Sequence, residues 1–333
     1  MVNEVLVCFG TRPEWLKVKP IVEKLDNCKL LFTGQHKDLL KGVEVDYKID
    51  IGESTNRLDQ ILTDCLLQFP NEEFKYIMVH GDTVSGFACA LAAYSRKIKI
   101  IHIEAGLRSF DINAPYPEEG YRQMISRIAS INLAPTELSR KNLLEEKASG
   151  KIFVVGNSVL DNIKHLQHST SYDNKILVTL HRWENHDIMA DWFSTIESIA
   201  NEYSQFEFFI PLHHHPNVQK HRDIFKKVNI LPALPHNELI ALMSKCKFVI
   251  SDSGGIQEEG TFLDKKVIVC RESTERPEGI QSGHLHLCPS PELLKELFIY
   301  ISSNYYIDNS KVDGCVYGNG NTGELIKKIL EDE

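Results

Sequence analysis

Short apolar runs alternate with longer segments of mixed polarity along almost the whole chain. In the first half the apolar runs are Val5–Phe9, Lys29–Thr33, Tyr76–His80, Ile98–Ile103 and Ile152–Val155. Their apolar residues are continuous rather than alternating, which is typical of strands buried on both faces of a sheet. The intervening segments show helical spacing, as between Trp15 and Leu25. This repetition predicts a parallel sheet covered by helices on both sides.

The same pattern repeats after a polar segment, residues 167–174, that is typical of a linker. Further strands are predicted at Lys175–Thr179, Phe206–Ile210, Lys247–Ser251 and Lys266–Val269. We therefore predict an α/β protein with two Rossmann-like domains, residues 1–166 and 175–320, whose strand ends face a cleft where ligands bind. Residues 321–333 are predicted to form a helix that packs back across the domains. A chain of 333 residues is long enough for two such domains.

The composition of the chain argues against several classes of partner and location. The chain has 37 basic and 46 acidic side chains, a net charge of −9, and its basic residues are scattered. We therefore expect no nucleic-acid partner and no membrane partner, because both need a positive field. The first residues read as a strand rather than a signal peptide, and no segment approaches the roughly 20 apolar residues of a membrane span. Eight cysteines stand without any CxxC pair, which indicates buried reduced thiols in a cytoplasmic protein.

Two motifs suggest cofactors that we do not expect. Residues 318–323, GNGNTG, match the G-x-G-x-x-G fingerprint, which requires a preceding strand and an acidic residue about 20 positions on. Only 10 residues follow, so we interpret the segment as a glycine loop closing a pocket. His213, His214 and His215 resemble a zinc tract, but adjacent side chains diverge and no pattern completes four ligands. We predict no metal and no organic cofactor, with His213 facing a ligand and its neighbours solvated.

Residues able to carry chemistry gather where the predicted strands end. Arg12 follows the first strand in the sequence FGTRPE, where backbone amides and the guanidinium can face an anion, although an ordinary turn capped by threonine explains the same residues. Asp82 and Glu104 close two later strands, and Glu118 opens a helix. Several acids near an arginine suit proton transfer, because crowding and burial raise carboxyl pKa values. Taken singly, each acid is equally well explained as a helix cap.

The second half offers groups suited to a diphosphate. Ser253, Gly254 and Gly255 follow a strand and open a helix, where exposed amides and a hydroxyl can bind an anion. Glu259, one turn further on, can accept ribose hydroxyls, and Arg276 follows a later strand at the same edge. The set predicts a diphosphate-sugar nucleotide bound by the second domain.

Several motifs in order along the chain carry a family resemblance. They are GTRPEWLK (10–17), HGDT (80–83), EAGLRS (104–109), PEEGYRQ (117–123), PTELSRKNLL (135–144), GNSVLD (156–161), HRWEN (181–185), DSGGIQEE (252–259) and TERPEG (274–279). Together the motifs resemble the non-hydrolysing UDP-N-acetylglucosamine 2-epimerases over nearly the whole chain. The resemblance implies a glycosyltransferase-B architecture and interconversion of UDP-GlcNAc with UDP-ManNAc, which supplies precursors for surface polysaccharide. It also implies elimination of UDP through 2-acetamidoglucal without a cofactor, and we expect a homodimer.

The resemblance also assigns roles to individual residues. The implied catalytic residues are Asp82, Glu104, Glu118 and His181. The implied contacts to the UDP-sugar substrate are Arg12, Lys17, Arg108, Arg122, Arg182, Glu184, His213, Ser253, Gly254, Gly255, Glu259 and Arg276. Which carboxylate is the base and which is the acid stays open.

The chain departs from the family pattern at Trp15, Tyr121 and Leu180, and the first two are expected near the sugar, so the particular UDP-HexNAc stays open. The stretch between His36 and the HGDT motif is also short. In bacterial relatives this region helps to hold a second, activating UDP-GlcNAc, so we predict no strict requirement for that activator. The alternatives are a hydrolysing epimerase that releases ManNAc and UDP, a glycosyltransferase of the same architecture and a nucleotide-sugar sensor.

Overall fold

The computed structural model describes residues 3–36, 42–166, 170–307 and 315–333, and the chain forms two compact units. Met1–Asn162 and Gly320–Glu333 make the first unit, and Ile163–Asn319 make the second. The linker expected at residues 167–174 lies partly outside the described residues. Its described part is held by the second unit, because the backbone amides of Ser171 and Asp173 each donate to a carbonyl of residues 244–245 at 3.0 Å. The division between the units therefore lies earlier, after Asn162.

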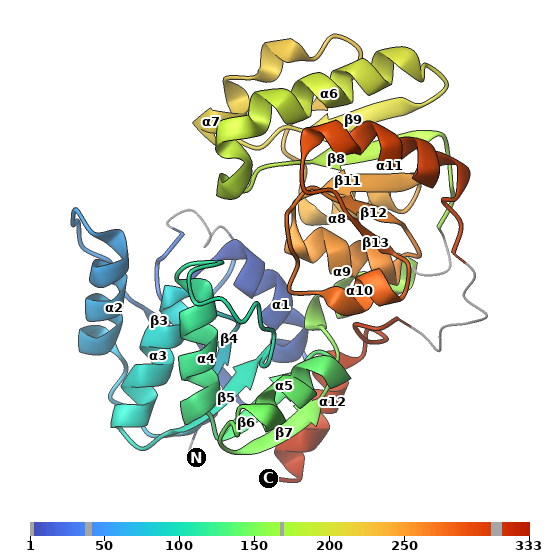
Figure 1. Cartoon of the computed structure of the whole chain (residues 1–333). Helices are drawn as coiled ribbons and strands as arrows, with labels where there is room; N and C mark the ends of the chain where they lie inside the picture. The colour runs from blue at the N-terminus through green and yellow to red at the C-terminus, as the bar shows by residue number, and fades with distance from the viewer. Residues whose placement is uncertain (1–2, 37–41, 167–169, 308–314) are drawn as a thin grey trace. The chain divides into compact units, whose positions relative to one another are not determined.

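The first unit is built on a parallel sheet of seven strands in the order β3-β2-β1-β4-β5-β6-β7 (Figure 1). The strands are β1 (Asn3–Phe9), β2 (Cys28–Phe32), β3 (Tyr47–Lys48), β4 (Phe74–His80), β5 (Lys99–Ile103), β6 (Ile131–Ala134) and β7 (Lys151–Val154). Sequence analysis missed β3, which has only two residues, and β6, whose apolar run is interrupted by Asn132. Asn132 is tolerated there because its side-chain amide donates to the Ser149 carbonyl at 2.8 Å.

Helices cover both faces of this sheet, which explains the unbroken apolar runs. They are α1 (Arg12–Val22), α2 (Arg57–Gln68), α3 (Val84–Ser95), α4 (Glu118–Ile128), α5 (Glu137–Glu145) and α12 (Thr322–Glu331). Leu6 and Cys8 of β1 pack in one core with residues of α2, α3 and α4. The alternate residues Val5, Val7 and Phe9 pack in a second core with α1 and α12. Both faces of each central strand are thus buried.

The C-terminal helix α12 belongs to the first unit and packs against α1. The backbone amides of Thr322 and Gly323 donate to the Asp161 carboxylate at 3.0 and 2.8 Å. A Cβ atom on Gly323 would lie 2.7 Å from the Pro20 carbonyl oxygen, so a glycine permits the close approach of α12 to α1. The GNGNTG segment therefore begins a helix that is anchored to the first unit, which replaces our interpretation of it as a loop closing a pocket.

The second unit repeats the design with six parallel strands in the order β10-β9-β8-β11-β12-β13. The strands are β8 (Lys175–Thr179), β9 (Glu207–Pro211), β10 (Asn229–Leu231), β11 (Phe248–Ser251), β12 (Val267–Val269) and β13 (Leu285–Leu287). The helices are α6 (Met189–Glu202), α7 (Pro216–Gln219), α8 (His236–Met243), α9 (Gly254–Phe262), α10 (Pro277–Gln281) and α11 (Pro291–Ser303). Phe298 of α11 lies 5.5 to 5.7 Å from Phe206, Phe208 and Phe248, measured between ring centroids, in the core beneath α6 and α11. The predicted fold class is confirmed, although β10 and β13 were missed.

Each strand order reverses direction once, and the reversal marks where ligands bind in doubly wound sheets. In the first unit it falls between β1 and β4, which are followed by Arg12, the first residue of α1, and by Asp82. In the second unit it falls between β8 and β11, whose following loops carry His181 and Ser253. The topology therefore places Arg12, Asp82, His181 and Ser253 at the switch points of the two sheets. No helix within the described residues is long and apolar enough to cross a membrane.

Candidate active site

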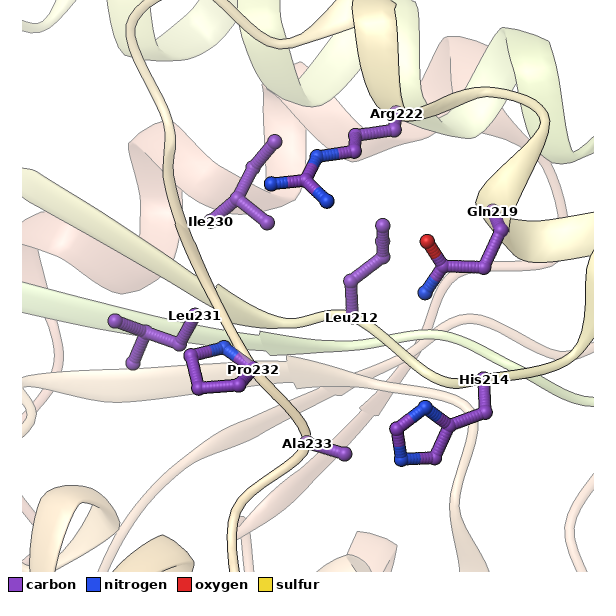
Figure 2. Close-up of a pocket in the computed structure, with 8 residues that line it drawn as sticks. All are labelled: Leu212, His214, Gln219, Arg222, Ile230, Leu231, Pro232 and Ala233. Atoms are coloured by element: carbon purple, nitrogen blue, oxygen red, sulfur yellow. The ribbon is translucent and has the colours of Figure 1, made fainter.

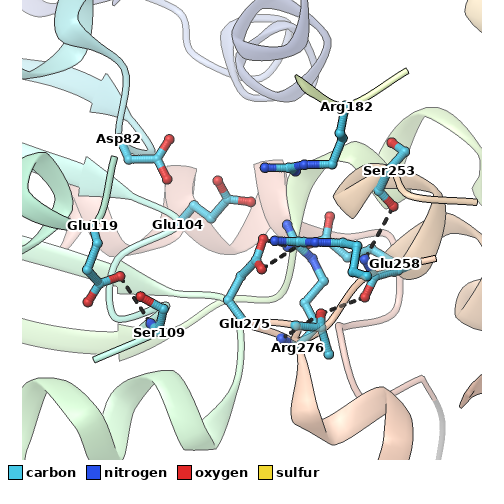
Figure 3. Close-up of polar contacts among 12 residues, drawn as sticks. Asp82, Glu104, Ser109, Glu119, Arg182, Ser253, Glu258, Glu275 and Arg276 are labelled. Atoms are coloured by element: carbon cyan, nitrogen blue, oxygen red, sulfur yellow. Dashed lines mark hydrogen bonds and ion pairs between the residues drawn. The ribbon is translucent and has the colours of Figure 1, made fainter. Parts of the chain in front are cut away.

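Asp82 follows β4 and forms an ion pair with Arg122 of α4. The Arg122 guanidinium also lies 3.3 Å from Glu119, a fully buried carboxylate that sequence analysis missed. Glu119 accepts a hydrogen bond from the backbone amide of Ser109 at 3.0 Å (Figure 3). Arg122 thus joins the predicted acid Asp82 to helix α4, on which the half-buried Glu118 is the first residue.

Glu104 follows β5 and lies among polar side chains from several elements. Its carboxylate pairs with Lys17 of α1, accepts a hydrogen bond from the Asn157 amide at 3.3 Å and lies 3.6 Å from Nε2 of His80. Its backbone has φ of 61°, a left-handed conformation that costs energy in a residue other than glycine and is common at functional sites. Burial lowers the pKa of His80 to about 4, so His80 is neutral near pH 7.

The backbone amides at the start of α1 are hydrogen-bonded to a side chain of the same helix. The Glu14 carboxylate accepts hydrogen bonds from the amides of Gly10 and Thr11 at 3.0 and 2.8 Å, and from the Thr83 hydroxyl at 2.7 Å. Burial raises the pKa of Glu14. Of the two interpretations of this segment, the structure therefore shows the turn capped by Thr11, while Arg12 itself remains exposed at the first turn. The spacing Thr11-x-x-Glu14 is that of a capping box, a signal present in the sequence.

Arg108 is also placed differently from the prediction. Its Nε and Nη2 atoms each donate to the Glu146 carboxylate at 2.8 Å, and Nη1 donates to the Leu107 carbonyl at 2.7 Å. The side chain is fully buried, so the guanidinium stabilises the loop after β5 against α5. We leave Arg108 out of the proposed substrate contacts.

In the second unit, Asp252 organises the loop after β8. It is fully buried and accepts hydrogen bonds from the backbone amides of His181 and Arg182 at 3.0 and 2.9 Å, and from the Asn185 side chain at 3.1 Å. Nδ1 of His181 lies 3.5 Å from the same carboxylate. The His181 ring stacks on His213, with 5.0 Å between centroids and 19° between planes. Both histidines were predicted as site residues from the sequence, whereas Asp252, which positions His181, was not.

The start of α9 differs from the start of α1, because the Ser253 side chain does not cap it and its first turn carries no acidic residue. A Cβ atom on Gly254 would lie 2.8 Å from Nη1 of Arg276, so the guanidinium rests directly against this turn. A Cβ atom on Gly255 would have no described atom within 4 Å, so the space in front of that residue is open. These are the features of an anion-binding helix start.

Arginines and glutamates form a paired network beside α9. Figure 3 shows Arg276 between Glu258 and Glu275, and its Nε atom donates to Glu258 at 2.7 Å. Glu275 also pairs with Arg271 at 3.0 Å. Burial alone would raise the pKa of Glu275, but the two arginines hold it well below its usual range. Arg182 pairs in the same way with Glu184, at 2.8 Å.

Glu259 is buried within α9 and lies 2.6 Å from Nε2 of His236, at the start of α8. Glu259 was predicted from the sequence as a ribose contact, whereas His236 was given no role. The pair places a hydrogen-bonded carboxylate one turn beyond Gly254 and Gly255.

The histidine tract lies in the loop after β9. His215 is exposed and packs against His186, with 4.6 Å between centroids. Among the described residues, no group of three or more His, Cys, Asp or Glu side chains is arranged to hold a metal ion. A surface hollow beside the tract, at the ends of β9 and β10, is shown in Figure 2. Its lining residues are Leu212, His214, Gln219, Arg222, Ile230, Leu231, Pro232 and Ala233.

The protein has two doubly wound sheets. Carboxylates lie at the edge of the first sheet, and an open helix start with arginines lies at the edge of the second. This arrangement defines a Rossmann-like protein of the kind that binds nucleotide-linked substrates. The family model described as UDP-N-acetylglucosamine 2-epimerase matches residues 22–331. This chain belongs to the UDP-N-acetylglucosamine 2-epimerase family.

Individual relatives agree with this assignment. The UDP-N-acetylglucosamine 2-epimerase of Neisseria meningitidis serogroup A is 35% identical over 98% of this chain and 99% of its own. The crystal structure of a UDP-GlcNAc 2-epimerase from Neisseria meningitidis bound to UDP-GlcNAc has a TM-score of 0.87 at 32% identity, covering 99% of this chain and 100% of that one. The Methanocaldococcus jannaschii enzyme in complex with UDP-GlcNAc and UDP has a TM-score of 0.80 at 30% identity, with the same coverage.

Proposed function

We propose that this protein interconverts UDP-N-acetylglucosamine and UDP-N-acetylmannosamine without hydrolysis, by eliminating UDP and adding it back. The observation that carries the proposal is the difference between the two helix starts. The amides at the start of α1 bind Glu14, whereas the start of α9 is free of a side-chain cap and lies against Arg276. This supports UDP binding by the second unit and proton transfer by the first, in a family named for this reaction.

In the proposed reaction a carboxylate base removes the proton at C2 while the C1–O bond breaks and its electron pair leaves with the β-phosphate oxygen of UDP. The product pair is 2-acetamidoglucal and UDP. A carboxylic acid then returns a proton to C2 from the other face as the same oxygen bonds again to C1. Asp82, Glu104 and Glu118 are the proposed acid and base groups, and which of them serves each face stays open.

The diphosphate gains charge as the C1–O bond breaks, so donors fixed in advance favour this step. The amides of Gly254 and Gly255, the Ser253 hydroxyl and Arg276 are the proposed donors, with His181 and His213 beside them in the second unit. Arg12, Lys17 and Arg122 are the proposed cationic groups of the first unit. Arg182, Glu184 and Glu259 complete the proposed contacts, with Glu259 as the acceptor of ribose hydroxyls.

The residues that differ from the family pattern do not argue for another sugar. The Trp15 ring packs on Phe9 at 4.8 Å, and the Tyr121 ring stacks on Phe87 at 4.9 Å. Leu180 is buried in the core of the second unit. Because all three side chains are engaged in apolar packing, UDP-GlcNAc and UDP-ManNAc are the substrates that we propose.

Turnover in deuterium oxide tests the mechanism directly. NMR should show deuterium at C2 of the epimer, and long incubation should release some 2-acetamidoglucal and UDP. Asp82→Asn, Glu104→Gln and Glu118→Gln should each lower kcat about 100-fold if that residue transfers a proton, with UDP affinity largely kept. Release of free ManNAc would instead favour the hydrolysing alternative, and wild-type rates in all three variants would exclude the carboxylate chemistry.

We further propose a cytoplasmic homodimer. The eight free cysteines, six of them buried, suit a reducing compartment. Light scattering of the purified protein measures the oligomeric state, and a mass of 38.0 kDa would identify a monomer instead.

A further inference from the structure

Gly81 lies directly before Asp82, and its backbone N–H and its carbonyl are both hydrogen-bonded to consecutive residues of β5. Its N–H donates to the Ile103 carbonyl at 3.0 Å, and its carbonyl oxygen lies 2.8 Å from Nε2 of His102. Gly81 has φ of 63°, and a Cβ atom there would lie 3.2 Å from the Glu104 carboxylate. Residues 102, 103 and 104 thus surround the turn that presents Asp82.

The hydrogen bonds of His102 define its tautomer. A carbonyl oxygen only accepts, so Nε2 must carry the hydrogen that binds Gly81. Nδ1 then accepts from the hydroxyl of Ser126 at 3.2 Å, and both side chains are buried. Burial lowers the pKa of His102 to about 4, so this neutral form persists near pH 7. Ser126 lies on α4, the helix whose Arg122 pairs with Asp82.

We infer that His102 is a positioning residue, which fixes the Gly81 peptide and thereby the placement of the Asp82 carboxylate beside Glu104. It connects β5, α4 and the β4–α3 turn through one neutral imidazole. The inference rests on the proposed function for its effect on catalysis, but the geometry of the ring is independent of it. Neither the HGDT motif nor the EAGLRS motif gives His102 a role, since it lies between them inside a buried strand.

The test compares two replacements whose side-chain amide nitrogen takes the place of one ring nitrogen, glutamine and asparagine, with leucine, which has no side-chain nitrogen. In His102→Gln the amide nitrogen occupies the place of Nε2 and can still donate to Gly81, whereas in His102→Asn it corresponds to Nδ1 and cannot reach. We expect kcat to fall about 10- to 100-fold in His102→Asn and His102→Leu, because a displaced carboxylate loses its alignment. His102→Gln should recover most of kcat, and KM and UDP affinity should stay within about threefold in all variants.

A merely structural role would instead make kcat follow thermal stability, with no advantage of glutamine over asparagine at equal melting temperature. That outcome would overturn the inference. Nitrogen-15 NMR of histidine-labelled wild-type protein provides the second measurement, with His102→Gln identifying the signal. A hydrogen on Nε2 that persists from pH 8 to 5.5 is expected, and an Nδ1–H tautomer or a charged ring would refute the inference. If the wild-type protein forms no epimer, the proposed function fails and the ring measurement decides this inference alone.

Discussion

Replacing Gly255 with alanine separates folding from nucleotide binding in the second unit. The added methyl group meets no described atom within 4 Å, and alanine is the better helix former by up to about 1 kcal/mol. The free energy of unfolding should therefore stay the same or rise slightly. If a diphosphate occupies the open space before α9, the methyl group excludes a phosphate oxygen from one backbone donor. Losing one charge-assisted hydrogen bond costs about 1.5 to 3 kcal/mol, or roughly 10- to 100-fold in the Kd for UDP.

Gly254→Ala is the matched comparison, because its methyl group would lie 2.8 Å from Nη1 and 3.0 Å from Cζ of Arg276. The guanidinium would have to move, which weakens its 2.7 Å hydrogen bond to Glu258. Stability should then fall by about 1 to 3 kcal/mol together with UDP affinity. Calorimetric titration with UDP and chemical denaturation measure the two quantities. UDP affinity equal to wild type in Gly255→Ala would refute the assignment of the α9 start to the diphosphate.

Four further predictions concern the ribose contact, the buried histidines, metal dependence and activation by UDP-GlcNAc. Glu259→Ala should weaken UDP binding by about 1 to 3 kcal/mol in calorimetry, whereas an unchanged Kd would remove Glu259 and its partner His236 from the site. His80 and His102 have lowered pKa values in the folded state, so lowering the pH from about 6.5 to 4 protonates them first in the unfolded chain. Denaturation at several pH values should show stability falling over that window, and less steeply in His102→Gln. Activity should survive dialysis against EDTA, and specific restoration by zinc would contradict this. A reaction started from pure UDP-ManNAc should run without a lag, and silence until UDP-GlcNAc is added would reveal an activating site.

The long alternation of apolar runs and amphipathic segments was enough to predict both sheets, because a strand buried on two faces leaves an unmistakable apolar run. The strands β3, β10 and β13 have only two or three residues and each includes a polar one, so they leave no such run, whereas the three-residue β12 is entirely apolar. Their pairing depends on neighbouring strands that are already in place. Polar Asn132 concealed β6 for a related reason, since its partner is the carbonyl of Ser149, outside any local pattern.

The candidate site was predictable only where partners are close in sequence. Glu14 forms a capping box with Thr11, three residues before it, and this spacing can be recognised in the sequence. The partner of Arg108 is Glu146, 38 positions away, and the carboxylate that caps α12 belongs to Asp161, 161 positions before Thr322. A motif shows which residue types are present, but tertiary contacts decide which of them remain available to a substrate.

The pairing of arginines with glutamates beside α9 suits the proposed reaction, in which UDP leaves and returns within one cycle. Arg182, Arg271 and Arg276 are matched by Glu184, Glu258 and Glu275, so the guanidinium groups are fixed before any nucleotide arrives. Fixed donors stabilise charge that develops on the diphosphate without reorganising at that moment. Three uncompensated arginines would also bind the released UDP anion tightly and favour the eliminated state. In the proposed reaction, a charge-matched network with an open helix start would stabilise the departing oxygen while leaving it reactive enough to attack C1 again.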